Sequence, residues 1–423
     1  MATTDTVPIG SLPPLGEVPQ QMLAQVIRQD RFGDPRSAFQ VETVPVPKLK
    51  PNEVLIAVMA TGINYNNIWA ARGIPIDVIA VRQKLGEPWD FHVGGSDASG
   101  IVYAVGSEVR DVSVGDEVVT HPGWWDESDP WVQSKHDPMV APSARIYGYE
   151  TNFGSFGQFT VVQSHQVMPK PSHQTWEEAA APNLVGATAY RMLFGFEGNR
   201  LADGDVVLVW GGSGGIGIQA IQLAKHFGGL PIAVVSDDER GEYCKKFGAV
   251  GYINRSEFSH WGIPPHWTDQ EGQRAWAKQA RAFGSKIWDI LGEHRNPAIV
   301  IEHPGEATVP TSIFVCERGG MVAICAGTTG YSATVDLRYL WVQQKRLQGS
   351  HGTNDEQAFA YNALVRRRLI DPALGQTGTF EEIPQLHYDM SVGAGSLGNR
   401  AALVGAASPG LGRSDDSARS EED

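Results

Sequence analysis

Residues 206–228, VVLVWGGSGGIGIQAIQLAKHFG, decide the fold of this chain. Val206–Trp210 is a short, uninterrupted apolar run, which predicts a parallel strand buried on both faces. Glycines then crowd a turn around Ser213, and apolar residues recur at helical spacing from Ile216 to Phe227. This order predicts a phosphate site, because the N-terminus of the helix presents free N–H groups and a positive partial charge.

We therefore expect a dinucleotide to bind at this turn. A glycine pattern alone is weak evidence, but here the strand and the helix that the mechanism needs flank it on both sides. The alternative is a purely structural glycine turn. The residues expected to hold the cofactor are Gly212, Ser213, Gly214, Gly215, Ile216 and Gly217.

Length and composition are those of an α/β enzyme with room for two domains. The net charge of −14 disfavours nucleic acid and anionic membranes as partners. No apolar run is long enough to span a membrane, and the start, MATTDTVPIG, lacks the features of an export signal. The three cysteines are scattered, which favours reduced core thiols. We expect a cytoplasmic protein.

The chain begins with strand signals and changes character near residue 200. From about 200 to 350, apolar strands alternate with helices, which predicts a doubly wound parallel sheet. Residues 121–145 are rich in tryptophan and proline and predict a long loop or lid. Residues 408–423 are rich in Ser, Asp and Glu, and we expect them to be a disordered tail.

The end of the second parallel strand indicates which nicotinamide cofactor binds. NAD enzymes usually place a carboxylate there for the ribose 2′-hydroxyl. Here Ser236 comes first, with Arg240 and Lys245 following, and a hydroxyl with cationic groups suits a 2′-phosphate. NADPH is therefore the expected cofactor, although Asp237 argues against it. In the alternative interpretation Arg240 and Lys245 are solvated helix charges.

Medium-chain zinc dehydrogenases resemble the first half of the chain but carry Gly-His-Glu where this sequence has Gly95-Ser96-Asp97. Their ligand cysteines are also missing, and three cysteines without short spacing cannot build a structural zinc site. We expect no metal.

Several motifs together resemble the crotonyl-CoA carboxylase/reductases, a zinc-free branch of the medium-chain reductases: IYGYETNFGSFGQF, WEEAAAPNLVGATAYRML, WGGSGGIG, IEHPGEAT, DLRYLW and KRLQGSH. The resemblance implies a GroES-like β-barrel catalytic domain (1–195 and 351–407) and a Rossmann domain (196–350). It also implies an enzyme that uses NADPH to reduce a 2-enoyl-CoA, crotonyl-CoA or longer, and traps CO2 as a (2S)-alkylmalonyl-CoA such as ethylmalonyl-CoA.

Four positions match the CO2 pocket of that family. By resemblance, Asn66 would donate an amide N–H to one CO2 oxygen, His351 would hold the other, and Glu150 would orient His351. Tyr149 stands where many relatives have Phe, and its hydroxyl would either wall off water or protonate the enolate. Taken singly, Asn66 would cap a helix, His351 would be structural and Glu150 would be a loop charge.

The CoA moiety brings phosphates that an acidic chain must hold locally. Arg281, Arg318 and Arg338 match basic positions of the family, or else are ordinary surface charges. Thr188 would face the nicotinamide or the pyrophosphate, with a helix cap or a core hydroxyl as the alternative. Gly352 replaces a bulky residue, often Phe, so we expect an enlarged acyl pocket.

Three other functions remain open: a 2-enoyl-CoA reductase that does not carboxylate, a quinone reductase, and a non-catalytic NADPH sensor. The sequence leaves open the preferred acyl chain, the ratio of carboxylation to protonation and the pathway. By analogy with the superfamily, the sheet edge near Met321–Ala326 would pair two chains, giving a homodimer or homotetramer.

Overall fold

The computed structural model describes residues 6–414 and divides them into two compact units. The first unit holds the residues up to Ala187, then Gly352–Arg368 and everything from Pro372 on. The second holds Thr188–His351 and Leu369–Asp371. The chain thus leaves the first unit after Ala187 and returns to it at Gly352. The sequence analysis had placed these two boundaries after residues 195 and 350.

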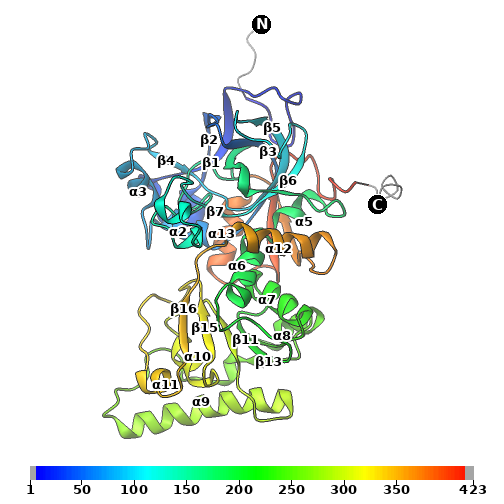
Figure 1. Cartoon of the computed structure of the whole chain (residues 1–423). Coiled ribbons are helices and arrows are strands. Elements are labelled where there is room, and N and C mark those ends of the chain that lie inside the picture. The colour runs from blue at the N-terminus through cyan, green and yellow to red at the C-terminus, as the bar shows by residue number, and fades with distance from the viewer. Residues whose placement is uncertain (1–5, 415–423) are drawn as a thin grey trace. The chain divides into compact units, whose positions relative to one another are not determined.

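The second unit is built on a six-stranded parallel sheet (Figure 1). Its strand order is β13 (Gly251–Asn254), β12 (Leu230–Val235), β11 (Val206–Trp210), β14 (Ile299–Glu302), β15 (Met321–Ile324) and β16 (Arg346–Gly349). All five residues of β11 are buried, as an inner strand covered on both faces requires. This confirms the predicted Rossmann sheet.

Helices cover the sheet and carry its ligand-facing turns. Helix α7 packs on β11 and β12, α8 on β12 and β13, and α9 on β13 and α10. The helices of this unit are α7 (Gly215–His226), α8 (Asp238–Lys246), α9 (Gln270–Leu291), α10 (Val309–Val315) and α11 (Leu337–Trp341); α6 (Asn183–Phe194) runs into it from the first unit.

The first unit is mostly β. Strand β3 (Glu53–Gly62) is buried along its whole length and pairs with three strands of a seven-stranded sheet. The order is β10 (Val167–Pro169), β6 (Glu117–Thr120), β5 (Ala98–Val105), β3, β18 (Asn399–Leu403) and β17 (Leu374–Gly378), with β9 (Phe159–Gln163) also on β3.

Smaller elements complete the first unit. A second sheet joins β2 (Gln40–Pro45), β1 (Gln21–Arg28) and β4 (Phe91–Val93), and β7 (Gly123–Trp124) pairs with β8 (Arg145–Ile146). The helices are α1 (Pro35–Ala38), α2 (Asn66–Arg72), α3 (Val78–Lys84), α4 (Pro130–Gln133), α5 (Trp176–Ala180), α12 (Asp355–Arg366) and α13 (Ile383–Ser391).

The expectation that the strand Met321–Ile324 forms the edge of its sheet needs correction. Strand β15 is not a sheet edge, because β16 pairs with it and occupies the outer position. A strand of four residues without an apolar run, RLQG, gave too little signal to be counted.

The tail was also misjudged over residues 408–414, which lie against helix α5. Gly410 donates its N–H to Glu177 (2.7 Å), Leu411 accepts from the N–H of Trp176 (2.9 Å) and Arg413 pairs with Glu178 (2.9 Å). Residues 415–423, the rest of that expectation, lie outside the described residues. Within the described part, no helix combines the length and apolar character needed to cross a membrane.

Two glycines test the contact between this tail and α5. Gly410 and Gly412 both have positive φ (87° and 98°), but only a Cβ at Gly412 would meet Trp176, at 2.7 Å from its ring. Each alanine substitution should cost about 1–2 kcal/mol for the left-handed backbone. Gly412→Ala should lose at least about 1 kcal/mol more from the crowded ring. The free energy of unfolding in urea measures both, and equal losses would contradict the packing.

Candidate active site

The glycine turn of the second unit forms an open helix N-terminus. Gly211 has a φ of 57° and faces His303, and a Cβ at Gly217 would overlap the carbonyl oxygen of Gly211. A Cβ at Gly212 would lie 2.7 Å from the Cβ of Ala233. The glycines therefore allow α7 to start directly on the turn, with Gly214 as its N-cap. Because Gly214 supplies no side-chain cap, the first N–H groups remain available to a phosphate.

The guanidinium of Arg240 reaches this turn. Its Nη1 lies 3.3 Å from Ser213 Oγ, so the predicted cation and the predicted turn serine are neighbours. Ser236 is exposed at the end of β12 and donates to Asp237 Oδ2 (2.8 Å). Asp237 caps α8 by accepting from Arg240 N (3.0 Å), and its Oδ2 lies 3.2 Å from Arg240 Nε. These bonds, the backbone N–H bond from Arg240 first, hold the pKa of Asp237 below its usual range. In this structure the carboxylate caps α8 and pairs with Arg240.

The remaining predicted cofactor residues differ in their surroundings. Lys245 is exposed on α8 and pairs with Glu242 (3.0 Å), three residues earlier on the same helix. Thr188 is buried inside α6, five residues from its start, which excludes the helix-cap interpretation. Ile216 is the second residue of α7, half-buried next to the turn.

Asn66 sits in a network of neutral amides and hydroxyls in the first unit. It is the first residue of α2, which has Tyr65 as N-cap and no side-chain cap bond. Asn66 therefore does not cap the helix. Its Nδ2 donates to Ser96 Oγ (2.8 Å), and its Oδ1 accepts from Asn67 Nδ2 (3.0 Å). These two bonds fix the amide plane and leave the second N–H of Asn66 for a ligand.

Asp97, the next residue after Ser96, is fully buried. Burial raises the pKa of this carboxyl to about 8, against opposing hydrogen bonds from Asn64 Nδ2 (2.8 Å) and Leu184 N (2.6 Å). Asp97 thus ties the segment before α2 to the first turn of α6. It holds this region while carrying little charge at neutral pH.

Tyr149 and Glu150 follow a tight turn in the same unit. Tyr149 is 5% exposed, and its ring centroid lies 6.5 Å from that of Trp69 on α2. Asn66 and Trp69 are one helical turn apart, so α2 brings Tyr149 and Asn66 into one region. Glu150 is partly buried and accepts from Ile146 N (2.8 Å), which excludes a freely solvated loop charge.

His351 is exposed and is the last residue of the long segment of the second unit; Gly352 begins the next segment of the first. Gly352 has a φ of 62°, and a Cβ there would lie 2.5 Å from Ile146 Cδ1 and 2.9 Å from Met139 Cε. The space beside Gly352 is therefore filled by other side chains. The missing side chain does not by itself enlarge an acyl pocket.

The three candidate CoA arginines are all exposed in the second unit. Arg318 donates to the carbonyl of Val342 (3.3 Å), the C-cap residue that ends α11. Arg338 is the second residue of that helix, so two of the three arginines lie at α11. Arg338 forms an ion pair with Asp336 (2.6 Å). A phosphate would have to compete with Asp336 for this guanidinium. No described contact links Arg281, on α9, to the other two.

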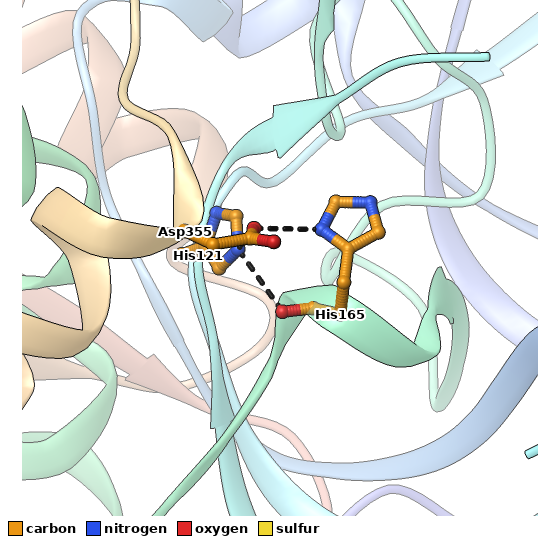
Figure 2. A group of neighbouring side chains, drawn as sticks. All are labelled: His121, His165 and Asp355. Carbon is orange, nitrogen blue, oxygen red and sulfur yellow. Dashed lines mark hydrogen bonds and ion pairs between the residues drawn. The ribbon is translucent and has the colours of Figure 1, made fainter. Parts of the chain in front are cut away.

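One polar cluster escaped the sequence analysis altogether. His121, His165 and Asp355 lie close together in the first unit (Figure 2). They are 44 and 190 residues apart in the chain and form no spacing motif. Only the fold brings them together.

Comparison with known proteins gives the family. A model described as alcohol dehydrogenase GroES-like domain matches residues 50–172, and one described as zinc-binding dehydrogenase matches residues 215–366. The chain is 48% identical to the crotonyl-CoA carboxylase/reductase of Cereibacter sphaeroides over 407 residues, 96% of this chain and 93% of that protein. This chain belongs to the crotonyl-CoA carboxylase/reductase family.

Solved structures agree with this membership, confirming the resemblance and the medium-chain reductase architecture. The crotonyl-CoA carboxylase/reductase AntE in complex with NADP is 50% identical, with a TM-score of 0.92, and covers 96% of this chain and 100% of its own. The 2-octenoyl-CoA carboxylase reductase CinF in complex with NADP and 2-octenoyl-CoA is 36% identical, with a TM-score of 0.87, covering 94% and 91%.

One of the matching family models has zinc in its description. The residues at Gly95-Ser96-Asp97, where zinc dehydrogenases carry Gly-His-Glu, do not suit this metal. Both oxygens of Asp97 accept N–H bonds, and Ser96 Oγ accepts from Asn66. The three cysteines all belong to the second unit, and burial raises the pKa of each thiol to about 12. Protonated thiols are poor zinc ligands, so no step is assigned to this metal.

The raised pKa of Asp97 predicts a pH dependence of stability. Its folded pKa of about 8 lies above the value of about 4 in an unfolded chain. Between these values only the folded chain keeps the proton, so stability should fall as the pH rises from about 4 to 8. Asp97→Asn removes this contribution, and its melting temperature should fall less between pH 5 and pH 8 than that of the wild type.

The quantity to compare is the change of melting temperature with pH. The melting temperature at a single pH is less informative, because the amide of D97N must also rearrange its bond with Asn64. Asp111→Asn, at an exposed position, serves as the control and should keep the wild-type slope. Identical slopes for all three proteins would show that Asp97 titrates normally.

Proposed function

We propose that this protein catalyses the NADPH-dependent reductive carboxylation of a 2-enoyl-CoA with CO2, giving a (2S)-alkylmalonyl-CoA such as ethylmalonyl-CoA. The observation that carries the proposal is the full-length similarity to crotonyl-CoA carboxylase/reductases, including a structure in complex with NADP. The open N-terminus of α7 and the neighbouring Ser213 and Arg240 suit the pyrophosphate and the 2′-phosphate of that cofactor.

The chemistry requires an environment without acids near the α-carbon. NADPH, when bound, supplies a hydride to the β-carbon of the enoyl thioester. The electron pair of the double bond then resides on the α-carbon and the thioester oxygen as an enolate. Attack of the α-carbon on CO2 forms one carbon–carbon bond and a carboxylate, and no proton is consumed. Proton transfer to the same carbon would give a saturated acyl-CoA instead.

Neutral donors are what such a site needs. The amide of Asn66, fixed by Ser96 and Asn67, would donate to one CO2 oxygen without offering an acidic proton. His351 would hold the other oxygen, with Glu150 selecting its tautomer. The buried ring of Tyr149 would exclude water from the enolate.

The CoA moiety would be held by cationic side chains of the second unit. Arg338 in α11, Arg318 at the end of that helix and Arg281 on α9 would bind the phosphates of its 3′-phospho-ADP. Thr188 would face the nicotinamide or the pyrophosphate. We further propose a homodimer or homotetramer in the cytoplasm, where three free cysteines remain reduced.

A plain 2-enoyl-CoA reductase is the second candidate. The observation that favours it is Tyr149, whose ring lies 6.5 Å from that of Trp69 on α2 and whose hydroxyl would be able to deliver a proton to the enolate. The two functions share the hydride step and differ only in the electrophile that meets the α-carbon.

Product analysis separates them. Crotonyl-CoA and NADPH are incubated with and without saturating bicarbonate and carbonic anhydrase, and the acyl-CoA is identified by mass. We expect ethylmalonyl-CoA as the main product at high CO2. Asn66→Ala should divert most of the product to butyryl-CoA while NADPH is still oxidised. Butyryl-CoA from the wild type at high CO2, restored to ethylmalonyl-CoA by Tyr149→Phe, would establish the reductase and assign the proton to Tyr149.

The cofactor assignment predicts the effect of removing the guanidinium beside Ser213. Arg240→Gln should raise the KM for NADPH by about 10- to 100-fold, the usual loss for a charged hydrogen bond, and should leave the KM for NADH nearly unchanged. Lys246→Gln, at an exposed position on the same helix, is the control. Lys245→Gln shows whether that residue adds to the site. An equal rise with both cofactors would refute a 2′-phosphate site at Arg240.

A further inference from the structure

His121, His165 and Asp355 approach each other at the spacing of metal ligands. Asp355 Oδ1 lies 3.0 Å from His121 Nε2 and 2.8 Å from His165 Nδ1 (Figure 2). The three residues come from separate places in the first unit: just after β6, the 3-10 turn Ser164–Gln166, and the first residue of α12. None of them belongs to the site described above.

Hydrogen-bond partners decide the protonation of His165. Its Nδ1 faces the carboxylate of Asp355, and its Nε2 faces Gln163 Oε1 at 2.8 Å. The amide of Gln163 is oriented, because its Nε2 donates to the carbonyl of Trp125 (2.8 Å). Both ring nitrogens of His165 therefore face acceptors, which requires a proton on each. The indole of Trp125 stacks on the ring at 4.1 Å, an arrangement that favours a cation.

His121 completes the cluster as a neutral donor. Its Nδ1 accepts the N–H of Gly123 (3.2 Å), so the single ring proton lies on Nε2, where it points at Asp355 and at the carbonyl of His165 (3.2 Å). Burial lowers the pKa of His121, which keeps it neutral. With that proton in place, Nε2 has no lone pair for a metal. The cluster thus holds protons instead of an ion.

The carboxylate is ionised. Burial alone would raise the pKa of Asp355, but hydrogen bonds from His121 and His165 outweigh it and hold this pKa well below its usual range. His121 is the titratable group that bonds directly to the pair. Asp137 accepts from Nδ2 of Asn354 (3.3 Å), the residue before Asp355. An imidazolium of His165 and a carboxylate of Asp355 therefore form an ion pair.

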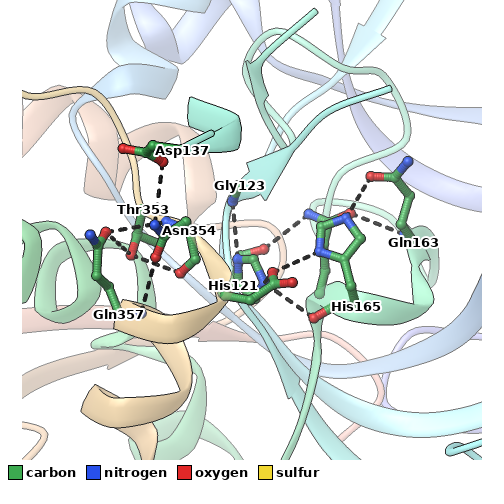
Figure 3. Close-up of polar contacts among 10 residues, drawn as sticks. His121, Gly123, Asp137, Gln163, His165, Thr353, Asn354 and Gln357 are labelled. Atoms are coloured by element: carbon green, nitrogen blue, oxygen red, sulfur yellow. Dashed lines mark hydrogen bonds and ion pairs between the residues drawn. The ribbon is translucent and has the colours of Figure 1, made fainter. Parts of the chain in front are cut away.

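Asp355 of this pair ends a short segment, Gly352–Asp355, and Figure 3 shows the polar contacts of Thr353 and Asn354 within it. Gly352 lies between Ile146 and Met139, and the carbonyl of Thr353 lies against Gly123. Asn354 caps α12 through Gln357 N (3.1 Å). The segment follows His351 directly, so whatever fixes Gly352–Asp355 fixes the backbone from which His351 extends.

We propose that the ion pair of His165 and Asp355 positions His351 for carboxylation. The proposal rests on the function assigned above, in which His351 holds CO2 and takes no part in hydride transfer. Losing the pair should weaken CO2 capture and spare the reduction.

The charge state can be tested without any activity. The full-length enzyme, labelled with ¹⁵N-histidine, is examined by NMR of the imidazole nitrogens, and His165→Asn identifies the signals of His165. Two protonated nitrogens at neutral pH are expected, with no metal in elemental analysis of the purified protein. One unprotonated nitrogen, or a stoichiometric metal that His165→Asn removes, would overturn the proposal.

Kinetics tests the positioning role. His165→Asn keeps an N–H donor toward Asp355 but not the charge, and Asp355→Asn removes the carboxylate. Each should raise the KM for CO2 about tenfold, as small misplacements of a reacting group do, and increase the share of saturated acyl-CoA. The KM values for NADPH and crotonyl-CoA should stay the same as in the wild type in both variants.

His136→Asn is the matched control, because His136 also packs on a tryptophan of the same loop, with ring centroids 4.5 Å apart. It should behave as the wild type. Equal losses of reduction and carboxylation, or an unchanged product ratio in both variants, would contradict the positioning role. If the wild type forms no alkylmalonyl-CoA, the assigned function and the role of His351 both fail, while the NMR result still decides the charge of His165.

Discussion

The close approach of two backbone segments, β11 with its turn and the start of α7, is the constraint on which the second unit depends. Gly217 meets the carbonyl of Gly211 so tightly that any side chain would push the helix away, and Gly212 leaves just enough room for Ala233 on β12. The same contact serves packing and binding. It seats α7 on an inner strand and leaves the first turn of that helix open toward an anion.

The first unit solves a different problem, which is to bury polar groups without placing acids near a reactive carbanion. The described side-chain partners of Asn66 are an amide and a hydroxyl, and the neighbouring buried Asp97 uses both of its carboxyl oxygens to accept N–H bonds from Asn64 and Leu184. One charged pair of this unit is that of His165 and Asp355. There each partner compensates the other, so neither can be removed alone without leaving a partly buried, uncompensated charge.

Several site residues belong to one local arrangement, although they are distant in the chain. Helix α2 presents Asn66 and Trp69, and Trp69 meets Tyr149. The turn at Ile146 binds Glu150 and also packs on Gly352, the residue after His351. A change at Ile146 or Met139 would therefore affect more than one of the residues assigned to CO2.

What the sequence determined by itself is the local pattern and the family. The strand Val206–Trp210, its glycine turn and the helix that comes after it follow from period and punctuation within one segment. The motifs of the crotonyl-CoA carboxylase/reductases also lie within short stretches, so the family could be predicted before any fold was known. Arg240 was placed at the cofactor turn because it stands a fixed distance after a strand end.

Only the tertiary structure decided the rest. The cluster of His121, His165 and Asp355 joins residues that form no spacing motif in the sequence. The outer position of β16 depends on its pairing with β15, which a four-residue segment without an apolar run does not predict. Residues 408–414 have the composition of a disordered tail, yet Glu177 and Glu178 hold them. The missing side chain of Gly352 predicted an enlarged acyl pocket, but the side chain of Ile146 occupies the space beside it. In each case a neighbour remote in sequence supplies the interaction, and only folding determines which residues become neighbours.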